Sequence, residues 1–399
     1  MEYHTEPNTK TQVNQSLHKV KDGYHRRYYL DWLRVLAVIL LVYFHSAAVF
    51  YVGSLGEFYI RNNQSSPGAI AFILFIHQWH MPLFFLISGA ATCLAFEHRT
   101  AQQYIAERFK RLFVPFMFGI LILVPPQVYY RLLSRSIYYS SYLQFYPHFF
   151  DGVRPKGNFE WSQLWFIVYL FTFSLAALPL FIYLKESGKI WLSKFVSLVE
   201  KPGAIFLLAI PLAAIEAALR PRWPGFQNLY DDWANFLLYI SYFIYGYLVC
   251  SDLKFEHAID RHLKIALSMA IASLLILFGL WKANILPEQG YSLGYILYQM
   301  LRGFNSWLWV IVIIGLARKY LNFSNKLLVY LNEASYPIFL LHQTILVPTA
   351  FYVVQLNITI IEKFILISTI SLTTTIIVYD LLIKRSNILR FFFGLKQKN

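Results

Sequence analysis

Ten long apolar runs follow one another along this chain, and they limit its fold more than any other feature. A helix needs about 20 apolar residues to cross the hydrocarbon core of a bilayer, which is about 30 Å thick. The composition agrees: 57% of the 399 residues are hydrophobic and 14% are charged, whereas about a quarter are charged in a typical soluble domain. We therefore predict an all-α membrane protein with about ten transmembrane helices. The runs lie near residues 29–52, 69–96, 112–130, 161–184, 204–220, 232–250, 263–281, 294–317, 327–350 and 360–383.

The distribution of Lys and Arg predicts how these helices are oriented. The chain has 35 Lys and Arg against 21 Asp and Glu, a net charge of +14. The tails and loops on the side of the N-terminus hold 24 of the basic residues, and the opposite loops hold nine. Because loops rich in Lys and Arg stay in the cytoplasm, both termini are expected to be cytoplasmic. The basic residues are scattered between apolar runs, which argues against a nucleic-acid-binding face.

Three segments are expected along the chain: a polar cytoplasmic tail at 1–27, one integral membrane domain at 28–385 and a short basic cytoplasmic tail at 386–399. No small-residue cleavage pattern follows the first apolar run, so we interpret it as a membrane helix and not as a signal peptide. Two cysteines, Cys93 and Cys250, cannot form a disulfide framework, and no Cys/His cluster indicates a metal site.

The first run contains two polar side chains that an ordinary membrane anchor does not need. A charged group at the centre of a bilayer costs about 2.5 to 3.5 kcal/mol, so such a group is a functional candidate. Arg34 and His45 are eleven residues apart, which places them on one face of a helix, about 16 Å apart along its axis. Asp31, one turn before Arg34, is expected to pair with it. The structural alternative is an interfacial Arg and a separately packed His.

The second run carries two histidines one turn apart, His77 and His80, followed by Pro82 and by the small pair Ser88–Gly89. Proline removes a backbone donor and small residues permit close helix approach. The pattern predicts an interrupted helix with two imidazoles inside the protein. The structural alternative is two histidines satisfied by neighbouring carbonyl groups.

Three further polar residues lie in the fifth, eighth and ninth runs: Glu216, Arg302 and His342. At about 1.5 Å per helical residue, they fall in the outer half of the bilayer, as do His45, His77 and His80. We therefore predict a polar cavity at this depth with Glu216 and Arg302 as counter-ions, while Arg220, four residues after Glu216, is a competing partner. Glu333 lies on the opposite side of its helix from His342 and should not share the site.

Cationic and aromatic residues mark the ends of the third and fourth runs. Arg108, Lys110 and Arg111 precede the third run and could hold phosphate groups, but the positive-inside rule also explains them. Trp161 and Trp165 begin the fourth run, where an aromatic belt at the membrane interface is the first interpretation. Recognition of a sugar face is the alternative.

In these same stretches the chain resembles acyltransferase family 3, the polytopic membrane acyltransferases that modify cell-surface carbohydrates and other envelope acceptors and that include the glucan biosynthesis protein C type. The resemblance covers nearly the whole chain. It is carried by Leu30–Arg34 with His45, by His80–Gly89, by Arg108–Pro115, by Gln163–Phe166 and by Ser335–His342.

The resemblance implies a cell-membrane enzyme that takes an acetyl or succinyl group from cytosolic acyl-CoA and delivers it to a hydroxyl on the far side. The family's catalytic His falls on His45, as general base or acyl carrier, and its Arg falls on Arg34, with Asp31 orienting it. Binding of the CoA phosphates falls on Arg108 and Arg111, with Lys110 between them. Acyl-CoA is then a substrate, and no permanently bound cofactor is expected.

Two other classes of function remain open at the level of the sequence. Buried His, Arg and Glu residues also form substrate or proton sites in transporters and flippases, although no inverted repeat supports that interpretation here. A non-catalytic membrane scaffold is the third alternative, and it predicts that the phenotype is unchanged when His45 is replaced by Ala.

Overall fold

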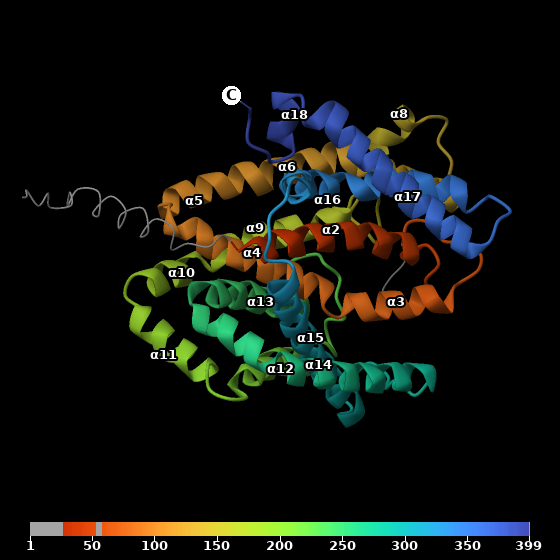
Figure 1. The fold of residues 1–399 in the computed structure, drawn as a ribbon. Helices are drawn as coiled ribbons and strands as arrows, with labels where there is room; N and C mark the ends of the chain where they lie inside the picture. The colour runs from red at the N-terminus through yellow and green to blue at the C-terminus, as the bar shows by residue number, and fades with distance from the viewer. Residues whose placement is uncertain (1–26, 53–57, 399) are drawn as a thin grey trace, which may run out of the picture.

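The computed structural model describes residues 27–52 and 58–398, and in these ranges the protein is a bundle of helices without a β-strand (Figure 1). Within the described residues, eight helices are long and apolar enough to cross a membrane, and two bent helix pairs bring the number to as many as ten. The predicted all-α membrane fold is therefore confirmed. The predicted tail at 1–27 lies outside the described residues except for Arg27.

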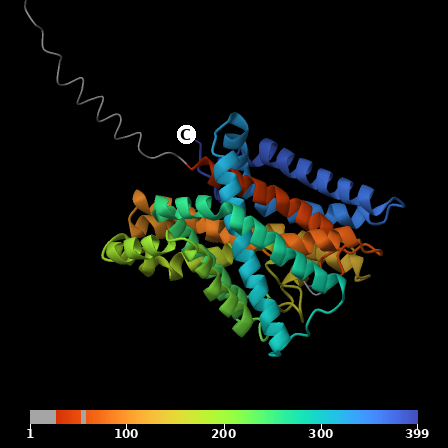
Figure 2. The ribbon, with the colours of Figure 1, turned by 60° about the horizontal axis from the view of Figure 1, so that its bottom comes forward.

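The spanning helices match the apolar runs in order. The first two runs form α2 (Tyr28–Ala48) and the pair α3 (Pro67–His77) and α4 (His80–Glu97). The last five form α13 (Trp233–Ser251), α14 (Leu253–Lys282), α15 (Leu293–Tyr320), α16 (Lys326–Val353), and α17 (Ile360–Val378) with a π-helical end, Tyr379–Ile383. Figure 2 shows α14 and α15 side by side.

The third span differs from its expected boundaries. It begins at Ala101, with a capping box at Thr100, and continues to Ser134, so the expected start at 112 is wrong. Polar residues of the first turns extend the helix beyond the apolar run. The span consists of α5 (Ala101–Arg108), α6 (Val114–Phe118) and α7 (Pro125–Ser134), joined by π-helical turns at Phe109–Phe113 and Gly119–Leu123.

Prolines explain why this span is irregular. Pro115 and Pro125 lack the N–H that would bond to the carbonyls of Arg111 and Leu121. Two tyrosine hydroxyls donate to these carbonyls instead: Tyr336 to Arg111 at 2.8 Å and Tyr146 to Leu121 at 3.1 Å. The freed backbone acceptors are thus satisfied within the protein, as a membrane interior requires.

The fourth run is bent, and the chain also bends sharply just before the fifth run. In the fourth, α9 (Trp165–Ala176) meets α10 (Leu178–Lys185) at 46°. The fifth run forms a 3₁₀ turn, Ala204–Leu208, and α12 (Ala209–Leu219), and the helix that precedes it, α11 (Lys189–Val199), is bent from this segment by 116°. Shorter helices lie outside the spans: α8 (Tyr142–Phe145) and, in the predicted C-terminal tail, α18 (Asn387–Phe392), whose Arg390 pairs with Glu333 at 2.7 Å.

Two glycines allow α4 and α13 to touch along their backbones. A Cβ atom at Gly89 would overlap the carbonyl oxygen of Phe243, and one at Gly246 would overlap that of Leu86. Small residues permit such close approach of membrane helices. On its other side α4 packs against α2, which in turn packs against α16, so the helices with the candidate site residues are neighbours (Figure 1).

Candidate functional site

One end of the α2–α16 interface holds a small polar network. Asp31 and Arg34 form the predicted ion pair, with 3.8 Å between Oδ1 and Nη1. Asn332 of α16 bridges them: its side-chain oxygen accepts from Arg34 at 3.2 Å and its Nδ2 donates to Asp31 at 3.1 Å. The amide therefore fixes the orientation of both charged groups.

A cavity of about 90 Å³ lies beside this network, between α2 and α4. Its wall combines charged side chains from the start of α2 with apolar side chains from α4. The lining residues are Arg27, Leu30, Asp31, Arg34, Ile87, Ala91 and Leu94. Such a wall suits a ligand that carries negative charge at one end and an apolar chain at the other.

The other end of the same interface holds a pair of histidines. Nδ1 of His45 lies 2.9 Å from Nε2 of His342, and the two rings stack with centroids 5.1 Å apart. The ring of Phe58 also stacks with that of His45, with centroids 5.7 Å apart. Arg34 and His45 thus both face α16, which confirms that they share one face of α2.

The hydrogen bonds of the pair determine where the protons are when both rings are neutral. Nδ1 of His342 lies 2.7 Å from the carbonyl oxygen of Phe339, which only accepts, so this nitrogen carries the proton. Its Nε2 is then the acceptor, and Nδ1 of His45 must donate to it. Neutral His45 consequently has an unprotonated Nε2, which is the arrangement that a general base requires.

The histidines of the second span lie beside this pair. Nε2 of His80 is 2.8 Å from the carbonyl oxygen of Ala37, so His80 has the carbonyl partner that the structural alternative predicted. His77 and His80 both stack on Phe44, with centroids 6.5 Å and 6.3 Å away. The helix is interrupted between them, at Gln78–Trp79, as the sequence indicated.

Of the two basic residues open to Glu216, Arg220 is its ion-pair partner and Arg302 is not. Glu216 forms a buried ion pair with Arg220, the competing partner one turn later, and Arg220 also donates to Asn235 at 2.9 Å. Arg302 instead donates to Gln299 at 3.0 Å and lies over the ring of Tyr298, 5.9 Å from its centroid. Arg220 follows Glu216 by four residues, so the helix itself brings the guanidinium next to the Glu216 carboxylate.

Two of the three cations at the third span already have partners. Arg108 donates to Thr92 at 3.3 Å and lies over Tyr104 at 4.6 Å, and Arg111 pairs with Glu107 at 3.0 Å. Lys110 is exposed. Because the helix begins at Ala101, these residues lie inside the third span's helix and do not precede it.

The aromatic residues of the fourth span are not a surface belt. Trp165 is 8% exposed and packs among Tyr169 and Tyr239, with ring centroids 5.4 Å and 5.7 Å away. Trp161 donates to the carbonyl oxygen of Gln227 at 2.8 Å. The expectation of an aromatic belt is therefore wrong for Trp165, whose ring packs inside the helix bundle.

Sequence reasoning missed Asn332 and the pairing of His45 with His342. A signal was available: Arg34 and His45 are eleven residues apart on α2, and Asn332 and His342 are ten apart on α16. Because α2 and α16 run in parallel, similar spacing on the two helices brings Arg34 to Asn332 at one end and His45 to His342 at the other. An amide carries no charge, however, so Asn332 did not stand out against the apolar background.

Comparison with known proteins identifies the family of the chain. Residues 27–383 match a protein family described as an acyltransferase domain, acyltransferase family 3. Proteins named Glucans biosynthesis protein C from Salmonella paratyphi B, Salmonella dublin and Salmonella gallinarum are 23% identical to the chain over 343 residues, which is 79% of this chain and 81% of each relative. No solved structure matches it. The chain therefore belongs to acyltransferase family 3 and is a multi-pass membrane acyltransferase.

Proposed function

We propose that this acyltransferase takes an acetyl or succinyl group from cytosolic acyl-CoA and transfers it to a hydroxyl of a carbohydrate or another envelope acceptor outside the cytoplasm. The observation that carries the proposal is the hydrogen-bonded series from the Phe339 carbonyl through His342 to His45. It leaves a base on the same helix face as Arg34, which lines the cavity at the other end of α2.

In the proposed reaction, Nε2 of His45 accepts the proton of the acceptor hydroxyl as its oxygen attacks the thioester carbonyl carbon. The positive charge on the imidazolium is stabilised by His342, which accepts from its Nδ1. When the tetrahedral intermediate collapses, the carbon–sulfur bond breaks and the His45 proton passes to the leaving thiolate. The products are the acyl ester and CoA, and His45 returns to its neutral form. General base catalysis of this kind contributes about 10² to 10⁴ in rate.

The distance between the two ends of the site fits an extended donor. Arg34 and His45 are about 16 Å apart along α2. A ligand with its phosphates near Arg34 and its thioester near His45 would lie along the α2 face. Arg108, Lys110 and Arg111 remain proposed contacts for the CoA phosphates, and His77, His80, Trp165, Glu216, Arg302 and His342 remain the proposed surroundings of the cavity and acceptor.

Radiolabelled acetyl-CoA and succinyl-CoA test the proposal with purified protein in lipid nanodiscs. The expected result is release of CoA with transfer of label to an envelope glycan fraction, and loss of that transfer in His45→Ala. His257→Ala, which changes an exposed histidine on α14, is the matched control. Absence of CoA binding in titration calorimetry, or full transfer by His45→Ala, contradicts the proposal.

The acceptor can be sought in the cell. Envelope glycans from a strain that lacks the gene are compared by mass spectrometry with those of its parent. A missing acetyl or succinyl mass on one glycan identifies the acceptor class. Identical acylation in both strains argues for a different acceptor. The names of the relatives favour a glucan as the first acceptor to examine.

A further inference from the structure

Helix α11 does not continue either neighbouring span. It has eleven residues, Lys189–Val199, and is bent by 116° from the segment with α12 that follows it. A helix of eleven residues is about 16 Å long, which is too short to cross a bilayer alone. If α12 runs across the membrane, this bend places α11 closer to the membrane plane than to its normal.

One side of α11 is packed and the other is open. Val196 and Val199 are buried, and the ring of Phe195 lies 6.3 Å from that of Phe255 on α14. On the open side Trp191 is 66% exposed and Leu198 is 49% exposed. These two residues are seven apart and therefore lie along one line of the helix. An exposed apolar edge remains after α11 has packed on the protein.

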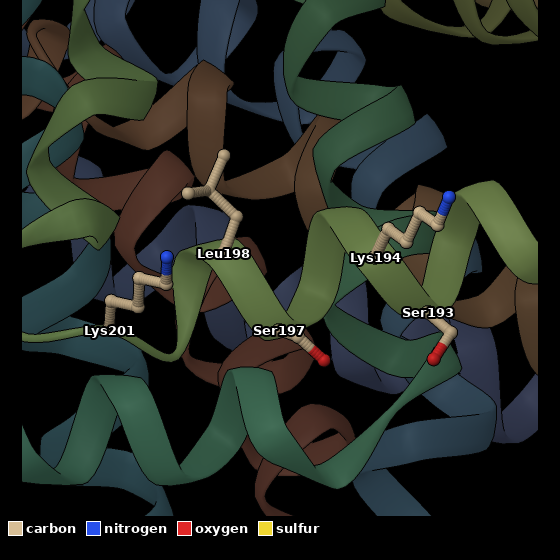
Figure 3. Close-up of a pocket in the computed structure, with 5 residues that line it drawn as sticks. All are labelled: Ser193, Lys194, Ser197, Leu198 and Lys201. Carbon is tan, nitrogen blue, oxygen red and sulfur yellow. The ribbon is translucent and has the colours of Figure 1, made fainter.

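Basic and hydroxyl side chains border this apolar edge around a shallow hollow of about 350 Å³ (Figure 3). Figure 3 shows the side chains of Lys194, Leu198 and Lys201 extending to one side of the helix and the hydroxyls of Ser193 and Ser197 to the other. The hollow is lined by these five residues: Ser193, Lys194, Ser197, Leu198 and Lys201.

The two lysines of the hollow have no carboxylate partner within the described part of the chain. Lys194 lies over the ring of Trp191, 5.6 Å from its centroid. The nearby carboxylate of Glu200 is paired with Lys254 at 3.5 Å, and Lys254 also donates to Ser197 at 3.2 Å. The hollow is therefore a place of net positive charge with hydroxyl groups at its edge.

We infer that α11 lies in the surface of the cytoplasmic leaflet and that its hollow binds the phosphate headgroup of an anionic phospholipid. Helices that lie in a membrane surface combine Trp and Leu on one side with Lys on the polar side. The cytoplasmic leaflet carries the anionic lipids that attract such basic segments, and the Lys and Arg distribution of the chain predicts that α11 is on that side.

The neighbouring surface favours a lipid over a protein partner. Leu207 and Ile210, which follow α11 in the chain, are 56% and 60% exposed. They belong to the segment that enters the membrane, so the apolar edge of α11 continues into the lipid-facing surface of the fifth run. Lys194 and Lys201 can then reach the headgroups while Trp191 and Leu198 contact the upper acyl chains.

Lipid retention tests the headgroup site. The full-length protein is delipidated in detergent, mixed with phosphatidylglycerol or phosphatidylcholine, and analysed by native mass spectrometry. Each basic residue near an anionic surface contributes about 1 kcal/mol, about fivefold in affinity. The variant Lys194→Gln/Lys201→Gln is expected to retain phosphatidylglycerol about thirtyfold more weakly. Lys264→Gln, an exposed lysine on α14, is the control and should bind normally.

Three results would overturn the headgroup site. The first is equal retention of phosphatidylglycerol by the wild type and the double variant. The second is displacement of the lipid by millimolar inorganic phosphate in the wild type, because that result identifies a site for a free anion. The third is preference of the wild type for phosphatidylcholine over phosphatidylglycerol.

A spin label tests the depth of α11 independently of lipid binding. A nitroxide is attached to Trp191→Cys in vesicles made of equal parts of phosphatidylcholine and phosphatidylglycerol, and its accessibility to oxygen and to a water-soluble nickel chelate is measured. A label at position 191 should be reached mainly by oxygen, and one at Ser193→Cys mainly by the chelate. Equal, water-like access at both positions would show that α11 stands away from the membrane.

Discussion

At the scale of single residues, the protonation of His45 depends on a residue 297 positions later. His342 accepts from Nδ1 of His45 and so keeps the opposite nitrogen unprotonated. In the proposed reaction His342 orients the ring of His45 and stabilises its charged form. The same two helices hold Arg34 through Asn332, so the position of α16 controls both ends of the site.

Replacement of His342 tests this dependence. His342→Phe keeps a flat ring but removes the acceptor, and it should lower kcat by about 10² with little change in KM for acyl-CoA. Steady-state kinetics with labelled acyl-CoA provide the measurement. A proportional rise in KM with unchanged kcat would show that His342 acts in binding and not through His45.

Replacement of Asn332 should instead affect the end of the site where Arg34 is proposed to bind the phosphates of acyl-CoA. In Asn332→Leu the hydrogen bonds to Arg34 and Asp31 are lost, and a bond to a charged group contributes about 1.5 to 3 kcal/mol. We expect the KM for acyl-CoA to rise about tenfold, while kcat stays close to that of the wild type. Asn322→Leu changes an exposed asparagine nearby and serves as the control; similar kinetics in the two variants would exclude the positioning role.

The buried pair of Glu216 and Arg220 should matter for stability whatever its role in the site. In Glu216→Gln, Arg220 keeps its charge at 7% exposure without its carboxylate, and breaking one partner of a buried pair costs about 3 to 5 kcal/mol. A clear fall in the thermal unfolding midpoint in detergent is expected. Arg302→Gln, which breaks no ion pair in the described ranges, should unfold near the wild-type temperature.

At the scale of helices, hydrophobicity was sufficient to predict most spans but not their ends. The runs identified α2, α13 and the helices after them, because lipid contact requires long apolar segments. The third span begins eleven residues early, since its capping box lies in polar sequence beyond the bilayer. Helix α11 was missed because its lysines and serines resemble a loop, although seven of its eleven residues are apolar.

The crossing of α4 and α13 gives a test at this scale. Gly89→Ala adds a Cβ against the carbonyl of Phe243, and overpacking of this kind costs about 1 to 3 kcal/mol. The unfolding midpoint should fall. Gly279→Ala on α14 meets nothing within 4 Å and should leave stability unchanged or raise it, because Ala favours helix. Equal midpoints in the two variants would contradict the close contact.

At the scale of the whole molecule, the distribution of charge predicts a topology that the helices alone do not reveal. Lys398→Cys should react with an impermeant maleimide only after cells are permeabilised, because the C-terminus is expected in the cytoplasm. Lys156→Cys, in the long segment after α7, should react in intact cells. Cys93 and Cys250 are buried and give little background. The reverse pattern would invert the proposed direction of acyl transfer.

The stacking of Phe58 near His45 has a consequence for the integrity of the membrane. A protein that lets two reactants meet from opposite sides also risks becoming a leak for protons. The flat rings of Phe58 and His342 lie 5.7 Å and 5.1 Å from that of His45, so two neutral rings border the proposed base. For the proposed reaction across the bilayer, these two rings are the first side chains to test as the barrier that keeps the membrane closed to protons.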